Sequence, residues 1–257
     1  MTQIHTLDSH AHLFPRWFKH NTDRVAQEAK NHGIGVINSA IDPKDYGFGL
    51  KFAKKHDNVF LTLGLAPQGI VKYRINVQAA LERLTVLSDR IVAIGEVGLD
   101  YHWVKDQKGR QIQRKAFLQA IKIANDQDLP IVIHSRKAEL DCMDILEKNA
   151  QTDVILHCFA GTVSEATRAV SLGWHISIPT AVTQRRVHRK LAEAIPLDNL
   201  IVETDSPFLS PDPRVRTNTP SKITRAIEEI AQLKQVSYDE VREATFRNCG
   251  RIFGLGP

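Results

Sequence analysis

The stretch Leu7-Asp8-Ser9-His10-Ala11-His12-Leu13 lies near the N-terminus and decides between the fold classes that suit this chain. An open α/β sheet of the dinucleotide-binding kind has a glycine-rich turn after its first strand, whereas this stretch has two histidines. Strand side chains alternate between faces, so His10 and His12 are predicted to point the same way. Two imidazoles aimed at one point form half of a metal site. Taken alone, however, such a pair is more often made of surface or capping histidines.

Short apolar runs alternate with longer amphipathic stretches along the whole chain, which is typical of strand–helix units around a parallel sheet. Runs such as Ile91-Val92-Ala93-Ile94 are apolar without alternation, as expected of strands buried on both faces. With a length of 257 residues, the pattern predicts an α/β fold, a TIM-type (β/α)8 barrel forming a single domain over residues 1–257. The predicted strands are Ile4–Asp8, Gly35–Ala40, Val59–Leu65, Ile91–Glu96, Ile131–His134, Val154–His157, His175–Ile178 and Leu200–Glu203.

Helix signals fill the intervals between these strands. Asn21 or Thr22 is predicted to cap a helix that Gly33 ends, and Ser237-Tyr238-Asp239-Glu240 reads as a capping box for the last helix. The proline-rich segment 207–220 is predicted to be a long loop after strand eight.

The composition is that of an ordinary globular protein, with 42% hydrophobic and 25% charged residues. We expect a cytoplasmic protein, because no stretch approaches the roughly 20 apolar residues of a membrane span and no basic-then-apolar leader is present. Cys142, Cys158 and Cys249 form no CxxC pair, which argues against a disulfide framework or a cysteine-based zinc site. The net charge of +5 is compatible with a polyanionic substrate without requiring one.

In a barrel of this kind, functional side chains lie at the carboxyl ends of the strands. Glu96, His134 and His157 each follow an apolar run directly, so each is predicted to face the barrel mouth or to need a buried partner. A single histidine at a strand end is more often a packed core residue, but five polar strand ends in one barrel predict a metal centre. The full set is Asp8, His10 and His12 after strand one, Glu96 and Asp100 after strand four, His134 after strand five, His157 after strand six, and Glu203 and Asp205 after strand eight.

Four histidines exceed what one catalytic ion with an open position uses, so two divalent ions (Mg, Mn or Zn) are predicted. Two ions about 3.5–4 Å apart can share a carboxylate and activate a water between them. Asp205 is the predicted proton acceptor; Glu203 has the same strand parity, and Asp205 is favoured because it lies further into the loop. The predicted ligands are Glu96 as the bridge, His10, His12 and Asp205 for one ion, and His134 and His157 for the other.

These segments, in this order, resemble the TatD family of metal-dependent hydrolases and deoxyribonucleases in the amidohydrolase superfamily, and the resemblance covers essentially the whole chain. It implies a TIM-type barrel with a divalent-metal centre and DNase activity, often as a 3′→5′ exonuclease on single-stranded DNA. It also implies metal roles for the same six residues. The matching segments are Asp8–His12, Gly95–Asp100, Pro130–Arg136, His157–Gly161, Glu203–Pro207 and Asn218–Pro220, with Thr245, Asn248 and Phe253 in the closing helix.

One segment departs from the pattern that this resemblance implies. Many family members have a histidine after strand three, in a Leu-Gly-x-His-Pro pattern, whereas this chain reads Leu63-Gly64-Leu65-Ala66-Pro67. Alanine neither binds phosphate, donates a proton nor ligates a metal. If the histidine assists phosphodiester cleavage in the family, cleavage by this chain relies on another group.

Basic residues near the predicted mouth are candidates for substrate binding. The segment Gln184–Lys190 contains Arg185, Arg186 and Arg189 after strand seven, where they are predicted either to grip phosphates or to form a solvated helix face. Arg136 follows the strand-five histidine and is predicted to contact a phosphate or to pair with a carboxylate.

Three functions fit the sequence, and the first is favoured. It is a two-metal nuclease acting on single-stranded DNA, with Trp17, Phe18 and Trp103 as candidate stacking side chains or as helix-packing residues. The second is a metal-dependent hydrolase of another bond, such as the ester of D-aminoacyl-tRNA or a small amide or lactone. The third is a non-catalytic metal-binding interaction module. A monomer or weak oligomer is expected. A small-molecule enzyme should have a closed apolar pocket over the metals, whereas a nuclease should have an open basic groove.

Overall fold

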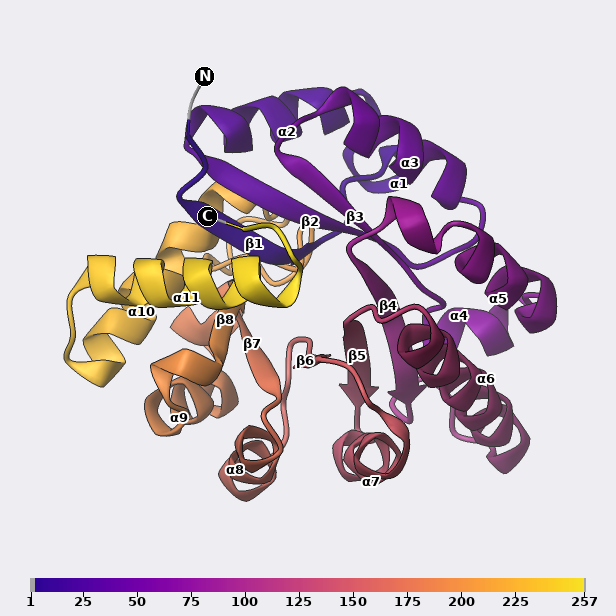
Figure 1. The fold of residues 1–257 in the computed structure, drawn as a ribbon. Helices are drawn as coiled ribbons and strands as arrows, with labels where there is room; N and C mark the ends of the chain where they lie inside the picture. Colours follow the sequence, from indigo (N-terminus) through magenta and orange to yellow (C-terminus); the bar gives the residue numbers. More distant parts are fainter. Residues whose placement is uncertain (1–2, 257) are drawn as a thin grey trace.

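The strands follow one another around the sheet in the order in which the chain makes them. In the computed structural model, which describes residues 3–256, eight strands pair side by side and in parallel, with helices along the outside (Figure 1). This is the predicted (β/α)8 barrel in one domain. The strands are β1 (Thr6–Ala11), β2 (Ile34–Ala40), β3 (Val59–Leu63), β4 (Ala93–Asp100), β5 (Ile131–Arg136), β6 (Val154–Leu156), β7 (His175–Pro179) and β8 (Leu200–Glu203).

Helices connect successive strands, and two more close the chain. Short 3-10 turns, labelled η1 to η5, stand at Lys19–Asn21, Ser88–Arg90, Thr180–Thr183, Leu197–Asn199 and Pro220–Ile223. The α-helices are α1 (Pro15–Phe18), α2 (Thr22–Asn31), α3 (Tyr46–Lys55), α4 (Pro67–Lys72), α5 (Val77–Val86), α6 (Gln107–Asp126), α7 (Glu139–Asn149), α8 (Val163–Ser171), α9 (Arg186–Ala194), α10 (Thr224–Lys234) and α11 (Tyr238–Ile252).

The predicted helix ends are largely those of the structure. Gly33 follows α2 with a φ of +66°, which a residue with a side chain adopts only with strain. Ser237 caps α11 by accepting a hydrogen bond from the backbone N–H of Glu240. Most of the basic segment after β7 forms the beginning of α9, with Arg185 at the N-cap position.

Two strands differ from their predicted bounds in a way that concerns the site. β1 and β4 both continue past the apolar residues that signalled them, because their ladders to neighbouring strands extend through polar positions. β1 still pairs with β2 at Ala11 after a register shift, and β4 pairs with β5 as far as Asp100. His10 and Glu96 therefore lie within strands, each at a point where the register of the ladder shifts.

The barrel closes between β1 and β8 through a bridge and side-chain bonds. Ala11 bridges Ser206, and the Asp8 carboxylate accepts hydrogen bonds from the Thr204 backbone N–H at 2.8 Å and from its hydroxyl. Inside the barrel, the hydroxyls of Ser9 and Ser177 are 2.9 Å apart. These contacts fix the loop after β8 to the strand that carries the two N-terminal histidines.

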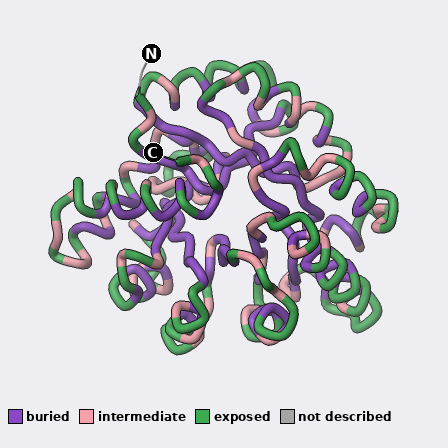
Figure 2. The backbone as a smooth tube through the Cα atoms, viewed as in Figure 1, coloured by how far each residue is buried: buried purple, intermediate pink, exposed green. Residues whose placement is uncertain are grey.

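The buried residues follow the strands and the inward faces of the helices, and the outer helix faces are exposed (Figure 2). A separate apolar cluster, which includes Leu7, Val132 and Ile201, fills one end of the barrel together with Cys249 and Phe253 of the C-terminal segment. The polar end of the barrel is thus the opposite one, where the strands finish. Within residues 3–256, no helix combines the length and the apolar character that a membrane crossing needs.

Candidate metal centre

The two histidines of β1 point to one place, as predicted. The Nε2 atoms of His10 and His12 are 3.2 Å apart, and both rings are buried. The other ring nitrogen of His12, Nδ1, is 2.9 Å from the Ser39 carbonyl oxygen at the end of β2. Because that carbonyl only accepts, it fixes the proton on Nδ1 and leaves the Nε2 lone pair free for a ligand.

Glu96 lies at the centre of the cluster. Its Oε2 is 3.2 Å from His10 Nε2 and 3.7 Å from His157 Nε2, while its Oε1 is 3.1 Å from His134 Nδ1. Burial raises the pKa of Glu96, but the charges and hydrogen bonds of these imidazoles outweigh burial and hold that pKa well below its usual range. The two carboxylate oxygens thus face different histidines, Oε2 towards His10 and His157 and Oε1 towards His134, as a bridging carboxylate can.

A glycine in the neighbouring strand loop allows Glu96 to occupy this position. A Cβ at Gly64, directly after β3, would lie 2.3 Å from the Glu96 carbonyl oxygen and 2.5 Å from its backbone nitrogen. No side chain fits there unless the backbone of β4 moves. Gly64 therefore allows the chain after β3 to pass directly against the β4 backbone at Glu96.

His134 and His157 are each held from behind by a carboxylate. His134 Nε2 is 3.0 Å from Asp100, and His157 Nδ1 is 2.9 Å from Glu203. Burial lowers both imidazole pKa values, but these carboxylates and Glu96 outweigh it, raising the pKa of His134 to about 10 and that of His157 to about 9. Each carboxylate fixes the ring so that its opposite nitrogen faces the cluster.

The position of Asp205 separates it from Glu203. Asp205 has a φ of +53°, its backbone N–H donates to the His10 carbonyl, and its Oδ1 is 3.3 Å from His12 Nε2. Burial raises the pKa of Asp205, but His12 and His157 outweigh burial and lower it. Asp205 therefore faces the cluster, while Glu203 lies behind His157. The sequence left this choice open.

The donor set suits divalent metal ions. Ligand atoms 2.0–2.1 Å from one ion lie about 2.8–3.0 Å apart in octahedral and about 3.3–3.4 Å apart in tetrahedral geometry. Four donor pairs in the cluster are separated by 3.1–3.3 Å, between these two ranges. A mixed set of imidazole and carboxylate ligands suits Zn or Mn better than a soft ion such as Cu(I), which prefers thiolate. Three trios have donor atoms within 4.8 Å of one another: His10, His12 and Glu96; His10, His157 and Asp205; and Glu96, His134 and His157.

The arginines predicted to bind substrate divide into two groups. Arg136 and Arg185 line the opening beside His134, His157 and Asp205. Arg186 instead lines a hollow between α8 and α9, and Arg189 forms an ion pair with Glu229 of α10. Arg186 and Arg189 thus lie on a helix face away from this opening, which is the alternative that the sequence left open, because α9 turns successive side chains to different sides.

The sequence placed Asp100 and Glu203 at strand ends but did not predict that they hold the ligand histidines in orientation. Both lie at the end of a strand two or four residues from a predicted ligand, which is a weak signal. Only the fold shows that Asp100 contacts His134 from behind and Glu203 contacts His157. The three aromatic residues that the sequence offered as stacking or packing side chains lie in different surroundings. Phe18 is buried, Trp17 packs on His12, and Trp103 is 64% exposed.

A (β/α)8 barrel with buried histidines and carboxylates at the carboxyl ends of its strands is the architecture of a metal-dependent hydrolase. The family described as TatD related DNase matches residues 7–254. The chain therefore belongs to the TatD family of metal-dependent hydrolases.

Individual relatives agree with this assignment over nearly the whole length. The metal-dependent hydrolase YabD of Bacillus subtilis is 31% identical over 254 residues, covering 96% of this chain and 98% of YabD. Deoxyribonuclease TATDN3 of Homo sapiens is 30% identical, covering 96% and 94%. The crystal structure of YJJV, a TatD homologue from Escherichia coli, matches with a TM-score of 0.87 at 26% identity, covering 97% and 98%.

Proposed function

We propose that this protein is a deoxyribonuclease that hydrolyses phosphodiester bonds of single-stranded DNA from the 3′ end with two divalent metal ions. The observation that carries the proposal is the double contact of Glu96, whose two oxygens face His10 on one side and His134 on the other. A carboxylate between two histidine groups is what a pair of neighbouring ions needs as a bridge.

The residues that would hold the ions are the predicted six. Their roles would be Glu96 as the bridge, with His10, His12 and Asp205 on one side and His134 and His157 on the other. When bound, the ions would lower the pKa of water and offset the charge of the phosphate. Support for two ions comes from the number of donors, since the three neighbouring trios together offer more atoms than one open site uses.

The protein's own groups would position the substrate and move the proton. Asp205 is ionised under the influence of the nearby imidazoles and is suited to accept a proton from the attacking water. Arg136 and Arg185 line the opening above the cluster and would bind the phosphate oxygens. The Ser39 carbonyl, Asp100 and Glu203 would hold the three imidazoles in orientation.

The opening over the cluster favours a phosphodiester over a small neutral substrate. Outside the cluster its charged lining residues are Arg136, Arg185 and Glu139, so two guanidinium groups are available to an incoming anion against one carboxylate. A hydrolase of small amides or lactones would need an apolar enclosure at the same place. The deoxyribonuclease name of the human relative points the same way.

The test is a metal-free preparation reloaded with Mg²⁺, Mn²⁺ or Zn²⁺ and assayed on end-labelled single-stranded DNA and on D-aminoacyl-tRNA. We expect metal-dependent shortening of the DNA from its 3′ end, and its loss in Asp205→Asn. Turnover of the aminoacyl ester alone would replace the nuclease proposal. Turnover that is unaffected by Asp205→Asn would remove that residue from the mechanism. Separately, Glu96→Ala should lower the number of bound ions; an unchanged number would refute bridging.

A further inference from the structure

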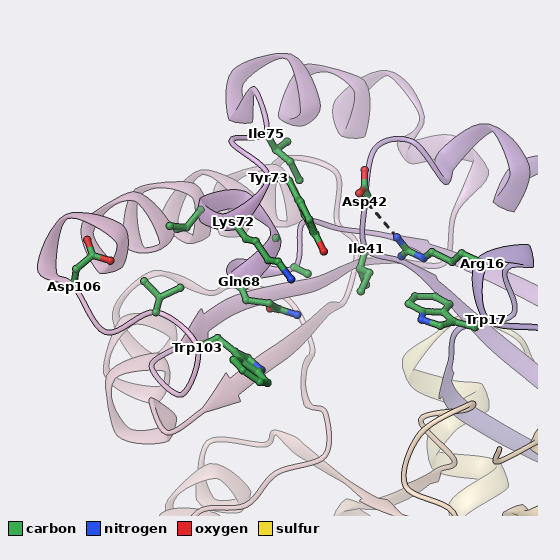
Figure 3. Close-up of a pocket in the computed structure, with 14 residues that line it drawn as sticks. Arg16, Trp17, Ile41, Asp42, Gln68, Lys72, Tyr73, Ile75, Trp103 and Asp106 are labelled. Carbon is green, nitrogen blue, oxygen red and sulfur yellow. Dashed lines mark ion pairs between the residues drawn. The ribbon is translucent and has the colours of Figure 1, made fainter. Parts of the chain in front are cut away.

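A second pocket, of about 500 Å³, opens beside the metal cluster. It lies between α1, α4 and the loop after β4, and Ala66 forms part of its lining. Figure 3 shows Tyr73 and Trp103 on one side, with Lys72 and Gln68 between these two, and Trp17 on the other side. We call this the aromatic pocket. Its volume is in the range of sites that enclose a group of nucleoside or small-ligand size.

Each aromatic side chain of this pocket has a cation beside it. The Arg16 guanidinium lies 3.9 Å from the Trp17 ring centroid, and Lys72 Nζ lies 5.2 Å from that of Tyr73. The third pair is Arg136 and Trp103, at 5.8 Å. A stacking surface next to a positive charge is the combination that single-stranded nucleic acids need, since bases alternate with phosphates along the strand.

The charges also have acidic neighbours, which limits where phosphates can lie. Arg16 is 2.7 Å from Asp45 and 4.0 Å from Asp42, so its charge is largely offset. Lys72 and Arg136 have no carboxylate within ion-pair distance among the described residues. The cations without an ion-pair partner are therefore on the side of Tyr73 and Trp103, where Asp106 also lines the pocket, while Arg16 stacks on Trp17.

Two residues connect the aromatic pocket to the metal cluster. The Trp17 ring packs against the His12 ring with their centroids 5.1 Å apart. On the other side, Arg136 lies near Trp103 and also lines the opening over His134 and His157. A nucleotide whose phosphate reaches the cluster would therefore have its base next to the pocket.

Two of the pocket's aromatics are unusually exposed for their size. Tyr73 is 60% and Trp103 64% exposed, so neither serves mainly to pack the core. The Gln68 side chain also points into the pocket (Figure 3), and its Oε1 accepts no hydrogen bond within residues 3–256. A side-chain amide can both donate to and accept from the edge of a base.

We infer that the aromatic pocket binds one unstacked base of a single-stranded DNA substrate, the base adjacent to the phosphate at the metal cluster. This inference rests on the proposed nuclease function and adds the place where the strand is held. Trp103 and Tyr73 would stack on the base, Gln68 would bond its edge, and Lys72 and Arg136 would contact the flanking phosphates. A paired base cannot enter, so the pocket would select unpaired ends.

The inference is tested by binding rather than by turnover. A short fluorescein-labelled thymidine oligonucleotide is titrated with the protein in EDTA, where no cleavage occurs, and anisotropy is read. A second oligonucleotide has an abasic 3′-terminal residue. We expect Trp103→Ala and Tyr73→Ala each to weaken binding of the intact oligonucleotide by about 5- to 150-fold, the range for loss of one stacking side chain. Binding of the abasic one should change little, and Trp103→Phe should keep most of the affinity.

Phe246→Ala is the matched control, since Phe246 lines a hollow at the opposite, apolar end of the barrel; it should bind both oligonucleotides like the unmodified protein. The inference is overturned if the unmodified protein binds intact and abasic oligonucleotides equally, or if the variants lose affinity for both to the same degree. Failure of the proposed function would look different: base-dependent binding would be present, and the metal-loaded protein would leave the DNA uncut.

Discussion

Replacing Glu203 by glutamine tests whether the carboxylates behind the histidines contribute to metal affinity. The Glu203 carboxylate is fully buried, and its Oε2 lies 2.9 Å from His157 Nδ1 and accepts from the Cys158 backbone N–H at 3.3 Å. Glutamine has nearly the same shape, and its carbonyl oxygen can still accept from Nδ1. Glu203→Gln therefore removes the negative charge and keeps the orientation of the ring.

The expected loss is confined to one part of the centre. Without the charge behind it, the His157 imidazole is a weaker base and a weaker ligand. Loss of such a partner lowers metal affinity by about 10- to 100-fold, which corresponds to about 1.4–2.8 kcal/mol. The trio of His10, His12 and Glu96 does not include His157, so an ion held there should keep its affinity.

The measurement is a titration of metal-free protein with Zn²⁺ in competition with a chromophoric chelator, repeated with Mn²⁺ by calorimetry. We expect one binding phase to shift to weaker affinity while the total number of ions per chain is unchanged. Glu193→Gln, on the exposed face of α9, removes a charge without touching the site and serves as control. Equal affinities for Glu203→Gln and the unmodified protein, with the fold intact, would refute the reasoning.

Three further changes probe packing, titration and substrate charge. Gly64→Ala should destabilise the fold by roughly 1–3 kcal/mol in urea unfolding and lower bound metal, because its Cβ would lie 2.3 Å from the Glu96 carbonyl oxygen; a variant that is normal in both respects would contradict this packing argument. Burial and the nearby charge of Arg185 lower the pKa of His188 to about 4 in the folded protein. As the pH falls, the His188 side chain is therefore protonated in the unfolded chain before it is protonated in the folded protein. Stability should drop by about 3 kcal/mol from pH 6.5 to 4, and His188→Phe should flatten that part of the profile; an identical pH dependence would exclude His188 as the cause. Arg136→Ala should reduce the salt dependence of DNA binding by a slope of about 0.7, whereas Arg189→Ala, already ion-paired on α9, should leave it nearly unchanged; equal effects would show that the opening does not bind phosphate.

The sequence allowed the fold and the site cluster to be predicted because both depend on local signals. Apolar runs locate the strands, and in a parallel barrel all their carboxyl ends meet at one face. Polar residues such as Glu96 and His134 stand directly after those runs, so their convergence follows from the fold alone. The predicted set comes together in the structure, while its metal roles stay predictions.

The other features depend on contacts between distant segments. The ladder of β4 runs on to Asp100 because β5 offers it a partner, which no local pattern reveals. Glu203 and His157 are 46 positions apart, and only the register of β6 and β8 around the barrel brings them together. The sequence left open whether Arg189 lies at the mouth or on a helix face; the choice depends on Glu229 of α10, 40 positions away, with which Arg189 forms an ion pair.

Ala66 connects the departure from the family pattern with the aromatic pocket. A histidine at this position would fill space that Ala66 leaves open, since Ala66 lines the aromatic pocket. Compared with family members that have histidine here, Ala66 thus both removes an imidazole and enlarges the aromatic pocket. If the proposed nuclease function holds, Lys72, which also lines the pocket, and Arg136, which lies beside Trp103, are candidates to offset charge on the leaving oxygen. A guanidinium or ammonium offsets that charge without supplying a proton at neutral pH. The leaving oxygen would then depend on electrostatic stabilisation more than on acid catalysis, and the base in the pocket would hold it near those cations.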